Sequence, residues 1–324
     1  MTDRKKIVTV GGGTGTFVVI SGLRTIPNLA LSAMVTMADD GGSTGRLRDA
    51  YGFLPPGDAR QALVALAPDG NVLRDLFAYR FLKGDVAGHN LGNLFLTALT
   101  DVLGSNEAAL QEASSILRVD GTVIPATEVP ATLCATLSDG STVLGQNTIS
   151  ESGTADRHIE SLSYETPLPI TVAAREALEE ADLIVLGPGL LYSSTIAALL
   201  GDGTQDAIRA SSARVVYIAN LFTKAGETDG YSLSRHCAEV EKYTGKSIDH
   251  ILVHNEGFSP EVLAWYANEA EFPLVDDMGE DPRVIRGPLA SVNIVPPLPN
   301  DPVRRSLMRH DSVLVAEALR PLIG

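Results

Sequence analysis

The stretch that decides the fold is VTVGGGTGT, residues Val8–Thr16. A short apolar run leads into it, and FVVISGLR, which has the pattern of a helix, follows it. Glycine loses more backbone entropy on folding than any other residue, so four glycines in five positions need a physical reason. One reason is a tight turn between a strand and a helix. The other is a phosphate-binding loop, in which bare backbone N–H groups approach an anion closely.

Known nucleotide motifs do not decide between the two. The dinucleotide pattern G-x-G-x-x-G fails because Thr16 stands in the place of its third glycine. The nucleoside-triphosphate loop fails because no Gly-Lys-Ser/Thr follows. The turn and the phosphate-binding loop both stay open at this point.

Composition limits the partners. The chain has 324 residues, is 44% hydrophobic and carries a formal net charge of −15. A surface this acidic repels nucleic acid and anionic lipid, so neither is expected as a general partner. The two cysteines form no disulfide framework, and no apolar stretch is long enough to span a bilayer. We expect a cytoplasmic protein without a membrane span.

Apolar strands alternate with helical segments along most of the chain. Residues 7–10 and 31–37 have the pattern of buried strands, and residues 17–23 that of a helix. The order predicts an α/β fold, with a doubly wound, mainly parallel, Rossmann-like sheet. Residues 63–165 interrupt this order with helical segments and a β-hairpin that turns at Asp139-Gly140. We therefore expect a single domain over residues 1–324 with an inserted portion.

Loops rich in Gly, Asp, Asn, Ser or Thr follow four predicted strands. Ligands of doubly wound sheets bind at the carboxyl ends of the strands, where the strand order reverses. The candidate binding residues in these loops are Gly11, Gly12, Gly13, Thr14, Gly15, Asp39, Asp40, Gly41, Gly42, Ser43, Gly187, Pro188, Gly189, Tyr192, Ser193, Ser194, Asn220 and Thr223.

Their chemistry suits a phosphorylated ligand. The first glycine loop (residues 11–16) and the second glycine loop (residues 187–194) each precede a predicted helix, so together they fit a diphosphate, or a phosphate and another group. Asp39 and Asp40 are candidates for reading a ribose, for binding Mg²⁺, or for capping a helix at residues 46–50. Arg46, Arg48 and Arg60 are cations that could offset phosphate charge.

The motifs GGGTG, VTMADDGGSTGRLR, LPPGDARQALVALA, GHNLGNL, ADLIVLGPG, NLFTKAGET and the late RHD run in order over nearly the whole chain. In this combination the chain resembles the gluconeogenesis factor family, a branch of the 2-phospho-L-lactate transferase superfamily. The resemblance implies a protein that binds a UDP-sugar, notably UDP-N-acetylglucosamine, and links carbon metabolism to cell-wall synthesis and cell shape. It adds the following candidate binding residues: Gly57, Asp58, Arg60, His89, Asn90, Asn93 and Arg309. For Asn90 a helix cap is an equal alternative.

The chain departs from the family pattern at several positions. The transferase branch usually has Pro-Asp-x-Asp where this chain has Pro-Gly-Asp from Pro56, which argues against its deazaflavin chemistry. Leu190 replaces a usual serine, and Gln146 stands where glutamate is common. Phe222, Lys224 and Ala225 replace the usual Met, Gln and Pro.

Two function classes follow. The first is a nucleotide-sugar-binding regulatory protein that acts through a protein partner in cell-wall synthesis and catalyses no reaction. The second is a Mg²⁺-dependent transferase of the phospholactyl or phosphoryl type, with Mg²⁺ at Asp39 and Asp40. A metal hydrolase based on His250 and His254 lacks a third ligand signal. Whether the chain forms a homo-oligomer stays open.

Overall fold

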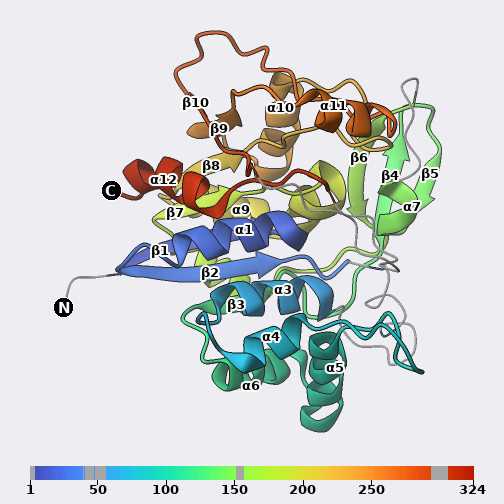
Figure 1. Cartoon of the computed structure of the whole chain (residues 1–324), viewed down its shortest axis with the longest axis vertical. Coiled ribbons are helices and arrows are strands. Elements are labelled where there is room, and N and C mark those ends of the chain that lie inside the picture. The colour runs from blue at the N-terminus through green and yellow to red at the C-terminus, as the bar shows by residue number, and fades with distance from the viewer. Residues whose placement is uncertain (1–3, 39, 41–46, 48–55, 151–156, 293–305) are drawn as a thin grey trace.

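A parallel sheet forms the centre of the molecule. The computed structural model describes residues 4–38, 40, 47, 56–150, 157–292 and 306–324. Within them, seven strands form one sheet in the order β10-β9-β8-β7-β1-β2-β3, and all neighbouring strands are parallel. The strands are β1 (Lys5–Gly11), β2 (Leu29–Val35), β3 (Thr122–Pro125), β7 (Leu183–Leu186), β8 (Arg214–Ile218), β9 (His250–His254) and β10 (Val284–Gly287). The predicted α/β, Rossmann-like fold is confirmed (Figure 1).

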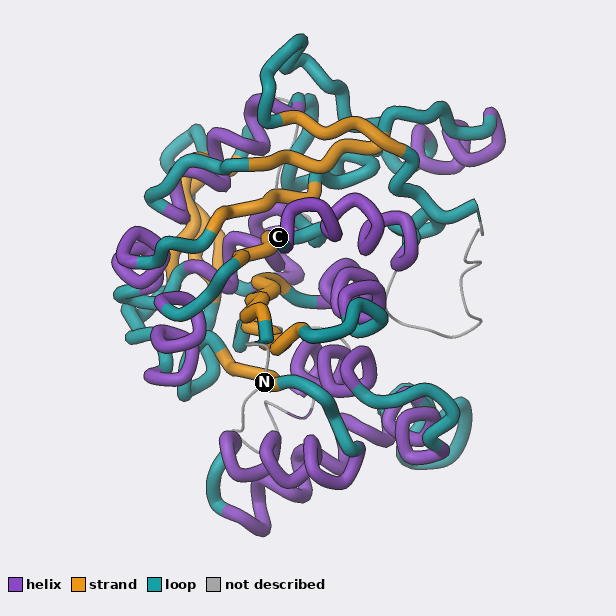
Figure 2. The backbone as a smooth tube through the Cα atoms, turned by 90° about the vertical axis from the view of Figure 1, so that its left-hand side faces the viewer, coloured by secondary structure: helices purple, strands orange, loops and turns teal. Residues whose placement is uncertain are grey.

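Helices cover both faces of this sheet, as Figure 2 shows. Successive side chains of a strand point to opposite faces. Ile7 of β1 belongs to the core on one face, with α1 (Gly13–Leu23), α3 (Pro56–Leu66) and α12 (Ser312–Ile323). Val8 and Val10 belong to the core on the other face. The helices there are α8 (Val172–Glu179), α9 (Thr204–Ala210) and α10 (Leu233–Thr244). Burial on both sides explains why the strand sequences are almost continuously apolar.

Residues 63–165 hold most of the remaining elements. They include α4 (Val72–Ala78), α5 (Leu91–Leu103), α6 (Asn106–Leu117) and α7 (Gln146–Ser150). A second, antiparallel sheet has the order β5-β4-β6, formed by β4 (Leu133–Leu137), β5 (Thr142–Leu144) and β6 (Ile159–Tyr164). The hairpin predicted at Asp139-Gly140 is the β4–β5 turn. β3 lies within the range but pairs with β2 in the central sheet. That this range is an insertion within one domain stays a prediction.

Some boundaries differ from the sequence pattern. α1 begins at Gly13 rather than at residue 17, and β2 ends at Val35 rather than at residue 37. Glycine has a low helix propensity, so the pattern underestimates a helix whose first turn is held by tertiary contacts. After β7, a π-helical turn (Leu191–Ile196) and a 3₁₀ turn (Ala197–Leu199) replace the expected regular helix. α11 (Pro260–Ala267) lies between β9 and β10.

The strand order reverses between β1 and β7. From β1 the chain adds β2 and β3 on one side, and it then returns to add β7, β8, β9 and β10 on the other side. The two glycine loops follow β1 and β7, so they lie at the carboxyl ends of the two strands that flank the reversal. Crevices of this kind hold the ligands of doubly wound sheets.

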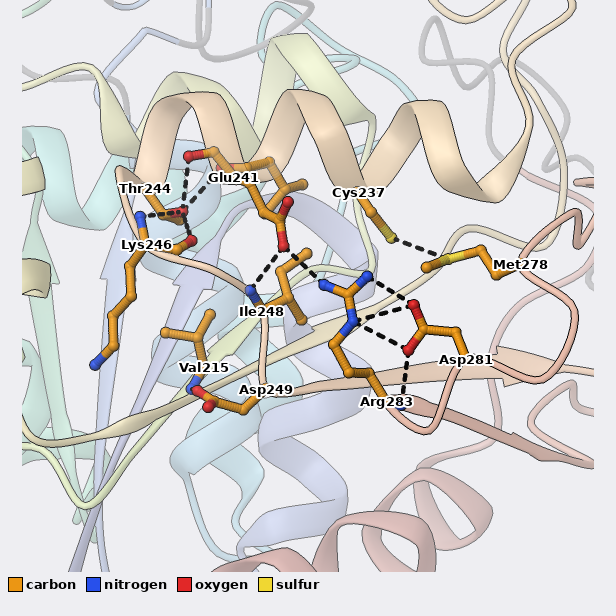
Figure 3. Close-up of polar contacts among 11 residues, drawn as sticks. Val215, Cys237, Glu241, Thr244, Lys246, Ile248, Asp249, Met278, Asp281 and Arg283 are labelled. Carbon is orange, nitrogen blue, oxygen red and sulfur yellow. Dashed lines mark hydrogen bonds and ion pairs between the residues drawn. The ribbon is translucent and has the colours of Figure 1, made fainter.

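An ion-pair network lies at the opposite edge of the sheet, at the amino ends of β9 and β10 (Figure 3). Arg283 lies between Glu241 of α10, with Nη1 3.0 Å from Oε1, and Asp281, with Nη2 2.8 Å from Oδ2. The Arg283 hydrogen bonds lower the pKa of Asp281 to about 2. The Glu241 carboxylate also accepts from the backbone N–H of Ile248, just before β9. These groups pair with one another and hold the end of α10 against the starts of β9 and β10.

In the described parts of the chain, no helix has the length and apolar character that crossing a bilayer requires.

Candidate functional site

The first glycine loop is shaped mainly by contacts within the protein. A Cβ added at Gly12 would stand 2.0 Å from Oδ2 of Asp58, and one added at Gly15 would stand 1.2 Å from the carbonyl oxygen of Pro188. Gly15 admits no side chain because it meets backbone, whereas a Cβ at Gly12 would require the Asp58 carboxylate to shift. Gly13 is different, because its φ is +67° and an added Cβ would meet no heavy atom of the described residues within 4 Å. Gly13 is therefore the glycine of this loop that faces open space.

The two glycine loops touch at the strand reversal. The backbone N–H of Gly12 donates to Oγ of Ser194 at 3.1 Å, and Gly15 lies against Pro188. The hydroxyl of Thr16 donates to the carbonyl oxygen of Gly12 at 3.2 Å. The loops predicted from sequence to share one site are thus packed together, although they are about 180 residues apart along the chain.

A carboxylate of the protein lies at the first glycine loop. Asp58 is in the first turn of α3, and its Oδ1 accepts the backbone N–H of Gly13 at 2.8 Å. The residue is 8% exposed. The Gly13 N–H, which the sequence predicts as a phosphate contact, is therefore bonded to a carboxylate of the protein itself. A ligand phosphate at Gly13 has to displace this carboxylate or share the space through a cation.

The second glycine loop also holds an internal carboxylate. Oε2 of Glu227 accepts the backbone N–H groups of Tyr192 at 3.2 Å and Ser193 at 3.3 Å. Its Oε1 accepts the hydroxyl of Ser193 and, at 2.9 Å, that of Ser150. The polar loop after β8 is predicted from sequence to contribute to the site, but Glu227 is not among the predicted binding residues. The feature that could have identified it is that a glutamate stands within that loop.

Tyr192 contacts Glu227 through its backbone N–H, and its ring takes no part in the candidate site. The side chain is fully buried, and its hydroxyl lies 3.1 Å from that of Tyr231. Burial raises the pKa of Tyr192 well above its ordinary value. The candidate residue is therefore part of the core, and only its N–H faces the loop.

Asp40 caps a helix that the sequence does not predict. Its two carboxylate oxygens accept the backbone N–H groups of Gln146 at 2.8 Å and Asn147 at 3.0 Å, at the start of α7. The alternative that an acid of this pair caps a helix at residues 46–50 falls on residues of which only Leu47 is described. Only the three-dimensional fold brings a helix from 106 residues away to Asp40.

Several sequence candidates lie outside the described residues. They are Asp39, Gly41, Gly42, Ser43, Arg46 and Arg48.

The candidates of the helical portion are engaged with one another. Nε of Arg60 donates to Oδ1 of Asn93 at 2.8 Å, and both residues are buried. Asn90 caps α5: its Oδ1 accepts the N–H of Gly92 at 2.9 Å, and its Nδ2 donates to the carbonyl of Ala78. Of the two alternatives for Asn90, the structure shows the cap. Gly57 lies in α3 beside Asp58, and His89 is half-buried directly before Asn90.

Asn220 holds the second glycine loop from the side of β8. Its Nδ2 donates to the carbonyl oxygen of Gly189 at 2.7 Å, and its Oδ1 accepts the hydroxyl of Tyr217 at 3.4 Å. The Tyr217 hydroxyl lies 3.0 Å from Nδ1 of His236. Burial lowers the pKa of His236 to about 4, so the ring is neutral near pH 7. Asn220 is thus a residue that orders the loop.

Thr223 and Arg309 lie on the same side of the molecule as β8. Oγ1 of Thr223 accepts the N–H of Phe272 at 3.0 Å, so it anchors the loop after β8. The carbonyl of Arg309 accepts the N–H of Ser291 at 2.8 Å. Next to it, burial lowers the pKa of His310 to about 4, and a hydrogen bond to the backbone of Ala219 opposes that shift. Thr14, also a candidate, is half-buried in the first turn of α1.

The departures from the family pattern have partners in this structure. Nε2 of Gln146 donates to the carbonyl of Ser193 at 2.7 Å, a bond that an ionised glutamate could not make. Nζ of Lys224 lies 2.6 Å from Oε1 of Glu271. The ring of Phe222 stacks on that of Tyr266 at 3.7 Å between centroids. Phe222 and Lys224 thus tie the loop after β8 to Tyr266 and Glu271, and Gln146 ties α7 to the second glycine loop.

Comparison with known proteins places the chain in a family. The family model for 2-phospho-L-lactate transferase CofD matches residues 7–289. The gluconeogenesis factor of Halalkalibacterium halodurans is 39% identical over 318 residues, covering 98% of this chain and 96% of that protein. The gluconeogenesis factor of Bacillus subtilis is 37% identical, covering 100% and 99%. A crystal structure of a UPF0052 family member from Bacillus halodurans has a TM-score of 0.89 at 36% identity, covering 99% of this chain and 100% of that chain. The chain therefore belongs to the 2-phospho-L-lactate transferase CofD family, among the relatives named gluconeogenesis factors.

Proposed function

We propose that the protein binds a nucleotide-diphosphate sugar of the UDP-N-acetylglucosamine type, and that it acts as a regulatory gluconeogenesis factor in the cytoplasm. In this role it links carbon metabolism to cell-wall synthesis and cell shape through a protein partner. The observation that carries the proposal is the open space at Gly13, in a glycine loop at the reversal of the strand order. The names of the relatives support the regulatory role.

Mg²⁺ fits this site as a bridging cation. A diphosphate at Gly13 would meet the Asp58 carboxylate that accepts the Gly13 N–H. Mg²⁺ binds through one or two carboxylates together with phosphate oxygens, so it would neutralise both anions at once. Asp40 keeps a further lone pair on each oxygen beside its two N–H contacts, and with Asp39 it is the metal pair expected from sequence.

A Mg²⁺-dependent transferase of the 2-phospho-L-lactate transferase type is the second candidate. The family model that matches the chain favours it. In the second glycine loop, the hydroxyl that lies beside a carboxylate is that of Ser193. It is buried and donates to Glu227, so it is badly placed to attack a substrate. We therefore favour binding without turnover.

Calorimetry with UDP-N-acetylglucosamine, a GDP-sugar, NAD and ATP tests the proposal, each with Mg²⁺ and with EDTA. We expect the UDP-sugar to bind most tightly, to bind more weakly in EDTA, and to be recovered unchanged. NAD binding as tight as the UDP-sugar would contradict the ligand class. Turnover of either nucleotide sugar, followed by chromatography, would favour the transferase instead.

A further inference from the structure

Glu227 is the most deeply buried carboxylate at the carboxyl edge among the described residues. The residue is 1% exposed, and its two oxygens accept two backbone N–H groups and two hydroxyls. The Ser150 hydroxyl divides its bond between Glu227 and the carbonyl of Gln146. Since each of these partners donates to it, the group acts as an acceptor on both oxygens.

These contacts join three segments that are distant in sequence. Ser150 ends α7, Tyr192 and Ser193 belong to the second glycine loop, and Glu227 lies in the loop after β8. The next residue, Ser194, accepts the N–H of Gly12. Glu227 thus fixes the backbone that places the Ser194 hydroxyl against the first glycine loop.

We propose that Glu227 is the built-in anion of the second glycine loop, so that this loop accepts no phosphate and the ligand's phosphates bind at the first glycine loop alone. The N–H groups of Tyr192 and Ser193 already donate to Glu227, so an anion arriving at them would have to break these bonds. A phosphate brought beside a buried carboxylate would also meet a like charge at low dielectric. For the ligand, this inference rests on the proposed function.

The two loops differ in how firmly their carboxylates are held. In the first glycine loop, Asp58 accepts one N–H, that of Gly13. Glu227 holds two N–H groups and a serine hydroxyl of the second loop. Displacing Asp58 therefore breaks fewer bonds to its glycine loop than displacing Glu227 would, and this difference favours the first loop as the phosphate site.

Removal of the carboxylate, followed by its replacement from solution, tests the role of Glu227. Glu227→Ala should lower the melting temperature by roughly 5–10 °C and weaken UDP-N-acetylglucosamine binding. Sodium formate, compared with sodium chloride at equal ionic strength, should restore at least half of both losses. The matched control is Glu271→Ala, which removes another buried carboxylate, one bonded to Lys224 rather than to a backbone N–H. It should show no gain specific to formate.

A second variant keeps the inference testable if Glu227→Ala does not fold. Glu227→Gln keeps the shape, accepts the two N–H groups with its oxygen and donates to the two hydroxyls with its amide. It should melt within about 3 °C of wild type and bind the UDP-sugar within about threefold of it, because Glu227 acts by placing the loop. Loss of binding by more than tenfold in a fully folded Gln variant would mean that Glu227 contacts the ligand, and would overturn the inference. So would equal formate recovery in both alanine variants. If wild type binds no UDP-sugar, the proposed function fails, while formate recovery of the melting temperature still decides the role of Glu227.

Discussion

Replacement of Gly13 by alanine separates a phosphate-binding loop from a plain turn. Gly13 has a φ of +67°, and an added Cβ would find no heavy atom within 4 Å in the part of the chain that the structure describes. The cost to stability is therefore backbone strain without a steric clash. The left-handed conformation costs an L-residue about 1–2 kcal/mol, so Gly13→Ala should lower the free energy of unfolding by that amount.

The effect on binding should be much larger than the effect on stability. If the ligand's phosphate fills the open space at Gly13, the new methyl group takes its place, and binding is lost. At a hundredfold excess over Kd, a ligand stabilises the wild-type protein by roughly 2.7 kcal/mol, which raises the melting temperature of a chain of 324 residues by about 4 °C. Gly13→Ala should show no such rise. Thermal melting with and without UDP-N-acetylglucosamine measures both quantities in one assay.

Two other glycines give matched comparisons. Gly104 ends α5 with a φ of +69° and equally open surroundings, so Gly104→Ala should cost the same stability and keep the full ligand shift. Gly15→Ala should be far more destabilising, because its Cβ would stand 1.2 Å from the Pro188 oxygen. If Gly13→Ala melts like Gly104→Ala and keeps the ligand shift, the loop is a turn and the phosphate reasoning is refuted.

Three further predictions concern stability and are read from urea unfolding. Asp40→Ala should cost about 1–2 kcal/mol by removing the cap of α7, and Asp40→Asn about half as much; equal stability in both would show that the cap is idle. Gln146→Glu should cost about 1–3 kcal/mol, because it exchanges a donor for a carboxylate against the Ser193 carbonyl, and a neutral result would mean that this bond is dispensable. Burial lowers the pKa of His236 and His310 to about 4, below the unfolded value of about 6.5, so the unfolded state binds more protons between these pH values. Stability should fall as the pH drops from 6.5 to 4, by on the order of 3 kcal/mol for each histidine, and a slope of opposite sign would contradict this.

The central sheet could be predicted because its strands are buried on both faces. β1 and β7 are apolar runs that end in glycine loops, and the helices between the strands show their own periodicity. β3 (TVIP) escaped prediction because it begins with Thr122 and ends at Pro125, whereas the equally short β7 is the unbroken apolar run LIVL. α7 escaped because a five-residue helix is held by its cap from Asp40 rather than by propensity.

The internal ligands of the two loops could not be predicted in the same way. Asp58 reaches Gly13 across 45 residues, and Glu227 reaches Ser193 across 34. Sequence patterns identify which loops lie at the carboxyl edge, since strand order and helix period decide that. They do not identify which acid turns inward to bond a particular N–H, because that depends on the packing of α3 and of the loop after β8.

The glycines of the first loop show why composition alone could not distinguish a turn from a binding site. An added Cβ at Gly12 would overlap Asp58, and one at Gly15 would overlap Pro188. Contacts within the protein therefore account for glycine at these two positions. A Cβ at Gly11 would likewise stand 2.9 Å from Oγ1 of Thr16. Among the glycines of the first loop, only Gly13 combines a left-handed backbone with open space around an added Cβ, as far as the described residues show. Its N–H donates to the Asp58 carboxylate, which an arriving phosphate could replace. The case for a ligand at this loop therefore rests on one glycine rather than four, which is why a single methyl group at that position can decide it.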